Sequence, residues 1–280
     1  MEFNEIKIVA DSSSDVLSLE HVNFSSAPLK IITADKEYTD NAELDVRSMV
    51  DTLLSYKGKS STSCPNAADW LSAFGNAKYI FVFTITATLS GSYNSAMLAK
   101  QTYEEEYPER RVFVLNTLTA GPEISLMIDK VKSLILEGSS FDEVCNKINE
   151  YTKNTGLLFM LQSLKNLANN GRVSPLVAKM AGFMGIRLIG KASAKGDLQP
   201  LDKCRGEKNA IDALAKRLYE LGYNGAKIKI SHCFNEKAAN DLKELIVSEF
   251  PKACVEIYAC GGLCSFYAEK GGLLIGFEKE

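Results

Sequence analysis

Residues 79–85 carry apolar side chains at all but one position, and this segment constrains the fold more than any other part of the chain. A continuous apolar strand of this kind is typical of a parallel sheet that is covered on both faces. Shorter apolar segments at 6–10 and 111–115 predict two further strands. Apolar residues with helical spacing follow the last two strands, at 93–103 and 123–137. This alternation of strand and helix predicts a parallel sheet with crossover helices.

The second half of the chain has a different pattern. Two predicted strands, at 187–192 and 198–204, flank the turn sequence Lys195-Gly196-Asp197, which is typical of a hairpin. Strands and helices then alternate, so we expect a sheet with both parallel and antiparallel neighbours. The sequence therefore predicts an α/β fold with two domains: residues 1–153, built on a parallel sheet, and residues 154–280, built on a mixed sheet.

The remaining expected elements are shorter. The polar cluster at residues 11–15, Asp-Ser-Ser-Ser-Asp, follows the first strand, and we expect it to cap a helix after it. Further strands are predicted at 27–32, 156–160, 226–232, 255–258 and 273–278. Further helices are predicted at 46–56, 141–153, 161–169, 176–184, 211–221 and 236–250.

The composition argues against several functions. A net charge of −3 over 280 residues does not suit nucleic-acid binding, which normally needs a basic face. No apolar run is long enough to cross a bilayer, so we expect no transmembrane segment. Cys254, Cys260 and Cys264 lie near one another in the sequence, but without CxxC spacing or a histidine. We therefore expect no metal site, and we interpret the seven cysteines as reduced thiols of a cytoplasmic protein.

Two hydroxyl-rich turns, at residues 61–66 and 88–93, each adjoin an apolar segment. A Ser or Thr hydroxyl without an adjacent base is a poor nucleophile, but it can donate to an anion at the mouth of an apolar cavity. We therefore expect these turns to bind a ligand through neutral donors rather than to cleave it. One alternative is that these residues only form turns and helix caps. Another is a small-molecule enzyme, either a hydrolase that uses Ser90 with a histidine or a phosphotransfer enzyme that uses Asp11.

Several motifs follow one another along the chain. They are Asp-Ser-Ser-Ser-Asp at 11–15, Thr-Ser-Cys-Pro at 62–65, Leu-Ser-Gly-Ser-Tyr-Asn-Ser-Ala at 89–96, Leu-Lys-Asn-Leu at 164–167, Gly-Arg-Val at 171–173 and Cys-Arg at 204–205. In these motifs, and over essentially all of its length, the sequence resembles the DegV family of bacterial fatty-acid-binding proteins. The resemblance implies two α/β domains with a long acyl chain buried between or beneath them, no cofactor, and no enzymatic activity of the protein itself.

The resemblance also implies the binding residues. The family holds the ligand carboxylate with hydroxyls of its TSxP and LSG turns, which correspond here to Thr62, Ser63 and Ser90, the last beside Gly91. Some members present the fatty acid to a partner kinase that phosphorylates the carboxylate and so feeds phospholipid synthesis. Family arginines that dock this kinase correspond to Arg172 and Arg205. A lipid sensor without a kinase stays open as an alternative to a carrier.

One position departs from the family pattern. Members commonly have a histidine shortly before a glycine pair near the C-terminus, and this chain has Tyr267 there, before Gly271 and Gly272. A tyrosine can still donate a hydrogen bond to the ligand, but it cannot become a cation near neutral pH. A group of large apolar residues could line the acyl cavity or could simply pack in the core. They are Phe159, Met160, Phe183, Met184, Ile186 and Phe266.

Overall fold

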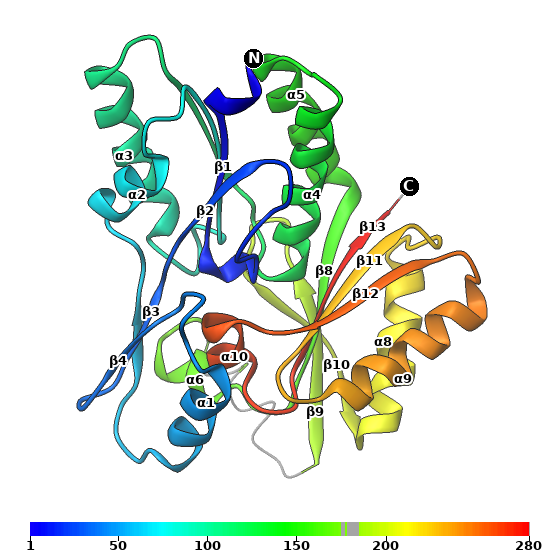
Figure 1. Ribbon diagram of the computed structural model, residues 1–280. Coiled ribbons are helices and arrows are strands. Elements are labelled where there is room, and N and C mark those ends of the chain that lie inside the picture. Colours follow the sequence, from blue (N-terminus) through cyan, green and yellow to red (C-terminus); the bar gives the residue numbers. More distant parts are fainter. Residues whose placement is uncertain (175–176, 178–184, 280) are drawn as a thin grey trace.

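The computed structural model describes residues 1–174, 177 and 185–279, and Figure 1 shows their arrangement. The first sheet has the strand order β2-β1-β6-β7, and all neighbouring strands are parallel. Its strands are β1 (Ile6–Asp11), β2 (Asn23–Ala27), β6 (Tyr79–Thr84) and β7 (Arg111–Asn116). The predicted parallel sheet in the first half is therefore confirmed.

Helices cover both faces of this sheet. Phe81 and Phe83 of β6 pack toward one pair of helices, whereas Ile80 and Val82 pack toward the other pair. All four side chains are fully buried, which explains why β6 shows no alternation of apolar and polar residues. The first pair is α4 (Pro122–Leu136) and α5 (Phe141–Tyr151), and the second is α2 (Ala67–Phe74) and α3 (Ser92–Glu106).

The second sheet has the strand order β10-β9-β8-β13-β11-β12. Strands β11 and β12 pair in parallel and the other neighbours are antiparallel, so the predicted mixed sheet is confirmed. Helices α8 (Glu207–Glu220) and α9 (Glu236–Glu249) cover one of its faces (Figure 1). Its strands are β8 (Thr155–Leu161), β9 (Ile186–Ala192), β10 (Leu198–Arg205), β11 (Lys227–His232), β12 (Cys254–Ala259) and β13 (Leu273–Glu278).

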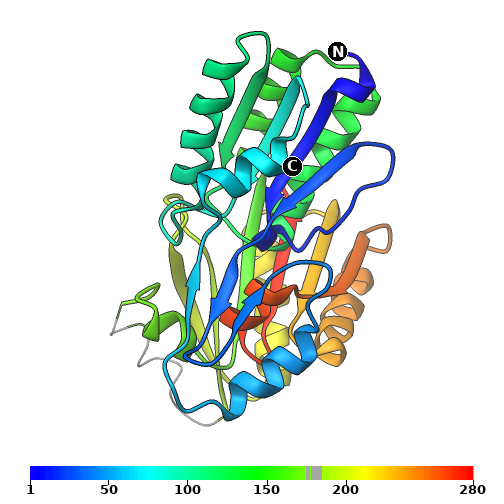
Figure 2. The same ribbon diagram turned by 60° about the vertical axis from the view of Figure 1, so that its left-hand side comes forward.

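A third, antiparallel sheet links the two halves of the chain. Its residues come from the first half, yet Ile31 of this sheet and Met49 of the following helix share a core with Phe159 and Phe266 of the second half. Figure 2 shows this sheet and α1 beside the C-terminal part of the molecule. The boundary at residue 153 therefore stays a prediction. The elements involved are β3 (Lys30–Ile32), β4 (Glu37–Thr39), β5 (Ser61–Ser63), α1 (Val46–Ser55), α6 (Lys165–Asn169) and α10 (Gly262–Ala268).

Some expected elements were wrong. The single strand at 27–32 is two strands in different sheets, separated at Pro28, which has no N–H to donate to a ladder. The helix expected after the 11–15 cluster is absent at residues 15–22, and the cluster itself forms one 3-10 turn, Ser12–Ser14, which the Asp11 side chain does not cap. The helix expected at 161–169 begins only at Lys165, because Leu161 still belongs to β8. Further 3-10 turns lie at Phe3–Glu5 and Thr152–Asn154. The helix expected at 176–184 falls outside the described residues.

Candidate functional site

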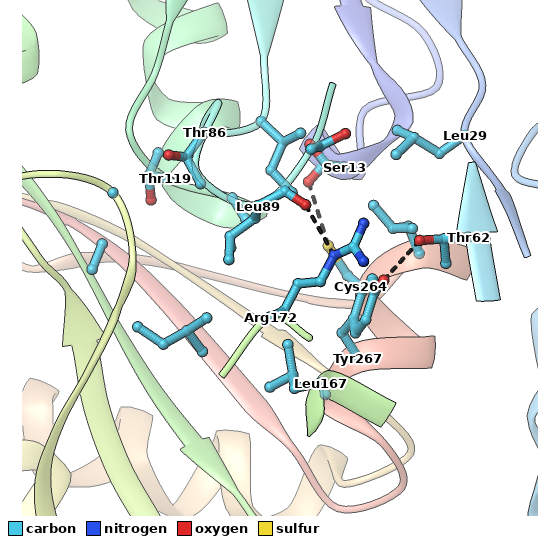
Figure 3. A pocket seen from close by; sticks show the side chains of 18 of the residues that line it. Ser13, Leu29, Thr62, Thr86, Leu89, Thr119, Leu167, Arg172, Cys264 and Tyr267 are labelled. Carbon is cyan, nitrogen blue, oxygen red and sulfur yellow. Dashed lines mark hydrogen bonds between the residues drawn. The ribbon is translucent and has the colours of Figure 1, made fainter. Parts of the chain in front are cut away.

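A largely apolar cavity of about 300 Å³ lies between the two large sheets (Figure 3). The carboxyl ends of the parallel strands form one wall, which includes Ile85 and Ala120. The C-terminal sheet forms the other wall, where Leu157, Phe159 and Leu161 alternate along β8 and so share one face. The carboxyl edge of a parallel sheet is a common place for ligands in α/β proteins.

Thr62 and Tyr267 mark one end of the cavity. Thr62 lies in the middle of β5, which pairs with β3, and Tyr267 lies in α10. The Thr62 Oγ1 and Tyr267 hydroxyl oxygens are 2.7 Å apart, so one donates a hydrogen bond to the other (Figure 3). Burial raises the pKa of Tyr267, while the bond to Thr62 and the charge of Arg172 act in the opposite direction. Tyr267 therefore stays protonated and can act as a donor at neutral pH.

The second hydroxyl turn meets the first at the same cavity. Ser90 Oγ accepts a hydrogen bond from Ser92 N at 3.2 Å, which leaves its own proton available for a ligand. Gly91 is the N-cap residue directly before α3, and a Cβ placed on it would lie 3.2 Å from Cys64 Sγ. Glycine therefore allows the two turns to approach closely. Ser63 and Cys64 also line the cavity beside Gly91.

Carboxylates of the first half fix the start of α10. Asp40 accepts hydrogen bonds from the N–H groups of Gly262, at 2.7 Å, and Leu263, at 2.9 Å. Asp15 accepts one from Gly261 N at 2.9 Å. Burial raises the pKa of both carboxyls. These bonds hold the helix that carries Tyr267 against the first half of the chain.

Asp11 does not line the cavity, but its hydrogen bonds hold segments of the cavity wall together. Its carboxylate accepts hydrogen bonds from Ser92 Oγ at 2.5 Å, from Ile85 N at 2.9 Å and from the Ser13 hydroxyl. The side chain is fully buried, and this burial raises its pKa. Through these three hydrogen bonds, the Asp11 carboxylate joins the ends of β1 and β6 to the start of α3. Because the three donors already occupy it, the carboxylate is poorly placed to act in phosphotransfer.

The hydrolase alternative lacks a base near Ser90. Among the described residues that line the cavity, none is a histidine. His21 is exposed in the loop before β2. His232 ends β11, and burial lowers its pKa. A serine without a neighbouring base donates hydrogen bonds but does not attack a substrate readily.

The two arginines occupy different places. Arg172 lines the cavity, and its guanidinium donates to the carbonyl oxygen of Leu89 at 3.1 Å (Figure 3). It also donates to the carbonyl oxygen of Asn170. Arg205 is exposed at the end of β10 and does not line the cavity. A permanent cation therefore lies in the cavity wall near Tyr267, beside the neutral hydroxyl donors of the two turns, and binding through these neutral donors stays a prediction.

Sequence reasoning missed part of the lining. Phe159 lines the cavity, whereas Met160 packs in the core under α8 and Phe266 in the core under α1. Ile186 does not line the cavity either, and the expected residues 183 and 184 fall outside the described part of the chain. Two lining residues, Thr86 and Thr119, had no distinctive signal in the sequence because they lie in short connections between strands and helices.

No group of three or more His, Cys, Asp or Glu side chains in the described part of the chain could hold a metal ion. No described helix is long and apolar enough to cross a membrane. All seven cysteines are described, and all are free thiols.

Known proteins resemble this chain over nearly all of its length. The family model described as "Uncharacterised protein, DegV family" matches residues 5–280. A DegV domain-containing protein of Streptococcus pneumoniae is 44% identical over 276 residues, which cover 97% of this chain and 98% of the relative.

Two solved structures share the whole fold. A DegV family protein of Eubacterium eligens, loaded with heptadecanoic acid, has a TM-score of 0.96 at 41% identity, over 98% of this chain and 100% of that one. The fatty acid kinase (Fak) B3 protein of Streptococcus pneumoniae, loaded with linoleic acid, has a TM-score of 0.96 at 43% identity, over 98% and 99% of the two chains. The family match and these likenesses show that this chain belongs to the DegV family.

Proposed function

We propose that this protein is a carrier that binds one long-chain fatty acid in the cavity between its sheets and presents the carboxylate to a fatty-acid kinase. One observation carries this proposal: two hydroxyl turns, Tyr267 and Arg172 meet at one end of a cavity whose other lining is mostly apolar. A fatty acid has a matching arrangement, with a charged carboxylate at one end and an apolar tail.

The energetics suit a long acyl chain. Burial of each methylene contributes about 0.8 kcal/mol, so the tail supplies most of the affinity. The carboxylate is costly to desolvate unless its oxygens are hydrogen-bonded. The hydroxyls of Thr62, Ser63, Ser90 and Tyr267 can supply these bonds, and Arg172 adds a charge-assisted donor.

The relatives support both parts of the proposal. The Eubacterium eligens protein is loaded with heptadecanoic acid, and the Streptococcus pneumoniae protein bears the name of a fatty acid kinase system and is loaded with linoleic acid. Arg172 lies at the cavity end where a kinase would meet the carboxylate, and exposed Arg205 is proposed as a further docking contact. The free thiols suit the reducing cytoplasm, where we propose that the carrier acts.

Ligand retention tests the binding part of this proposal. We expect purified protein to carry about one fatty acid per chain, as measured by native mass spectrometry, and we expect Thr62→Val and Ser90→Ala to lower that content. Cys64→Ala serves as the control, because the thiol belongs to the first turn and packs near Gly91 without a hydrogen bond among the described residues. Full lipid content in both hydroxyl variants would remove these residues from the site.

Phosphorylation tests the carrier part. The loaded protein is incubated with ATP, alone and with an ATP-dependent fatty-acid kinase. We expect acyl phosphate only in the presence of the kinase. Acyl phosphate or lipid hydrolysis by the protein alone would instead support an enzyme, and bound lipid that no kinase phosphorylates would support a lipid sensor.

A further inference from the structure

Phe159 occupies the middle of the cavity wall that β8 forms. Leu157 and Leu161 flank it on the same face of the strand, and all three side chains line the cavity. Phe159 is nevertheless only 2% exposed, so its ring lies almost entirely within the packed wall rather than in the cavity. The width of the cavity at this point therefore depends on where this large side chain is held.

Gly190 of the neighbouring strand β9 gives the ring its place. The register of the antiparallel pair puts Gly190 directly opposite Phe159. A Cβ on Gly190 would lie 2.3 Å from Phe159 Cζ and 2.6 Å from Phe159 Cε2, so the ring occupies the space that a side chain there would fill. Ala192, the next residue on this face of β9, lines the cavity, whereas Gly190 lies under the ring and does not. The ring can thus lie across β9 because Gly190 has no side chain.

A side chain on Gly190 would have to displace the ring. Carbon atoms in contact normally lie about 3.5–4.0 Å apart, so an alanine methyl group and the ring in its present place exclude each other. The surrounding interior is close-packed, and the open space beside the ring is the cavity that Phe159 lines. The displaced ring would therefore turn into the cavity and narrow it at the middle of the β8 wall.

We propose, on the basis of the proposed function, that Gly190 is a specificity-determining residue: it keeps the Phe159 ring out of the cavity and so leaves room for an acyl chain that is bent at its middle. In this proposal the middle of the tail passes Phe159. A cis double bond bends the chain, whereas a trans double bond leaves it nearly straight, so the cis chain needs more width there. Gly190 acts on the ligand through Phe159 and is in this sense a positioning residue.

Competition binding with oleic and elaidic acid tests this role. The two acids have the same composition and differ only in the geometry of one double bond, so the ratio of their affinities reports the width of the cavity rather than the stability of the protein. Delipidated protein is titrated with each acid against a fluorescent fatty acid. We expect Gly190→Ala to weaken oleic acid about tenfold more than elaidic acid, which corresponds to about 1.4 kcal/mol.

A double variant tests whether the effect passes through the ring. Leucine lacks the Cζ and Cε2 atoms of Phe159 that the new methyl group would meet. We therefore expect Gly190→Ala combined with Phe159→Leu to return the ratio of oleic to elaidic acid affinity to its native value. A loss of stability alone would not be reversed by this second truncation in the core.

Gly156→Ala is the matched control. Gly156 of β8 lies opposite Phe277 of β13, and a Cβ on Gly156 would lie 2.7 Å from Phe277 Cζ. The two glycine–phenylalanine pairs are alike, but Phe277 packs in the core under α8 and does not line the cavity. We expect this variant to lose stability and to keep the native affinity ratio.

The outcomes separate the two proposals. A Cβ on Gly190 would also lie 2.7 Å from the carbonyl oxygen of Gln199, and should Gly190→Ala fail to fold for this reason, Phe159→Trp makes the same test, because its larger ring exceeds the space above Gly190. Equal weakening of both acids in Gly190→Ala, no recovery in the double variant, an equal ratio shift in Gly156→Ala, or an unchanged ratio in Phe159→Trp would overturn the role of Gly190 while the fatty-acid carrier stands. Failure of the native protein to bind any fatty acid would overturn both.

Discussion

Thr62 Oγ1 and Tyr267 OH lie 2.7 Å apart, although 205 residues separate them in the chain. The bond joins β5 to α10, so a strand from the first half and the last helix close the same end of the cavity. One of the two hydroxyl protons is used in this bond, and the other stays available for a carboxylate oxygen. The pair is thus a donor set that depends on both halves of the chain.

This pairing predicts the behaviour of variants at both positions. We expect Tyr267→Phe and Thr62→Val each to weaken the binding of stearic acid by about 0.5–1.5 kcal/mol, the usual net value of a hydrogen bond. The double variant should lose less than the sum, because each single change already breaks the shared bond. Titration calorimetry of the delipidated proteins measures all three losses, and strictly additive values would contradict a shared role.

Gly196 lies in the hairpin between β9 and β10, where this hairpin contacts the first half of the chain. Its φ is +82°, and a Cβ on it would lie 2.1 Å from Thr86 Oγ1 and 2.9 Å from Leu118 Cα. We expect Gly196→Ala to lower the free energy of unfolding by about 2–5 kcal/mol, from left-handed backbone strain and overpacking together. Urea denaturation measures the change.

Gly206→Ala provides a matched control for the contact. Gly206 has nearly the same φ, +83°, but no atom lies within 4 Å of the position of its Cβ. We expect Gly206→Ala to lower the free energy of unfolding by only about 1–2 kcal/mol, the cost of the left-handed backbone strain. Equal losses in the two variants would show that the hairpin does not bear on Thr86.

The parallel sheet could be predicted because its signal is local. Ile80, Phe81, Val82 and Phe83 are all buried by helices on two faces, and such a strand must be apolar throughout. The two hydroxyl turns could be identified because their residues are consecutive in the sequence. Tyr267 was identified only through the resemblance to a family.

The rest of the site depends on contacts that no local pattern contains. Arg172 was expected only as a docking arginine, and it lines the cavity because the carbonyl oxygens of Leu89 and Asn170 accept its hydrogen bonds. Asp11 looked like a helix cap, yet it binds donors from segments far along the chain, such as Ser92. Thr119 gave no signal, because a lone threonine before a helix is common. These roles exist only after the two halves have packed together.

Asp15 predicts a pH dependence of stability. Burial and the nearby charge of Asp40 raise the pKa of Asp15 to about 8. Between the unfolded pKa, about 3.9, and this value, the folded protein binds a proton that the unfolded chain has released. Stability therefore falls as the pH rises through this window, by at most about 1.4 kcal/mol per pH unit.

Asp15→Asn tests this dependence. Asparagine cannot ionise, and it tolerates the left-handed φ of 57° at this position. We expect the variant to match the native protein near pH 4 and to be the more stable of the two near pH 8, as measured by urea denaturation. The control is Asp142→Asn, because Arg111 lowers the pKa of exposed Asp142 and the effect has the opposite sign. Parallel pH profiles of native protein and Asp15→Asn would contradict a buried, protonated Asp15.

Arg172 and Arg205 can be separated by binding and phosphorylation measurements. Arg172 stands in the cavity wall, so we expect Arg172→Gln to weaken stearic acid binding by about 1.5–3 kcal/mol, the range for hydrogen bonds to charged groups. Arg205 is exposed outside the cavity, so Arg205→Gln should bind stearic acid as the native protein does and lose only kinase-dependent phosphorylation. Titration calorimetry measures stearic acid binding, and acyl phosphate formation on fully loaded protein measures kinase-dependent phosphorylation. Native affinity in Arg172→Gln would remove this residue from the carboxylate site, and native phosphorylation in Arg205→Gln would remove that arginine from the docking surface.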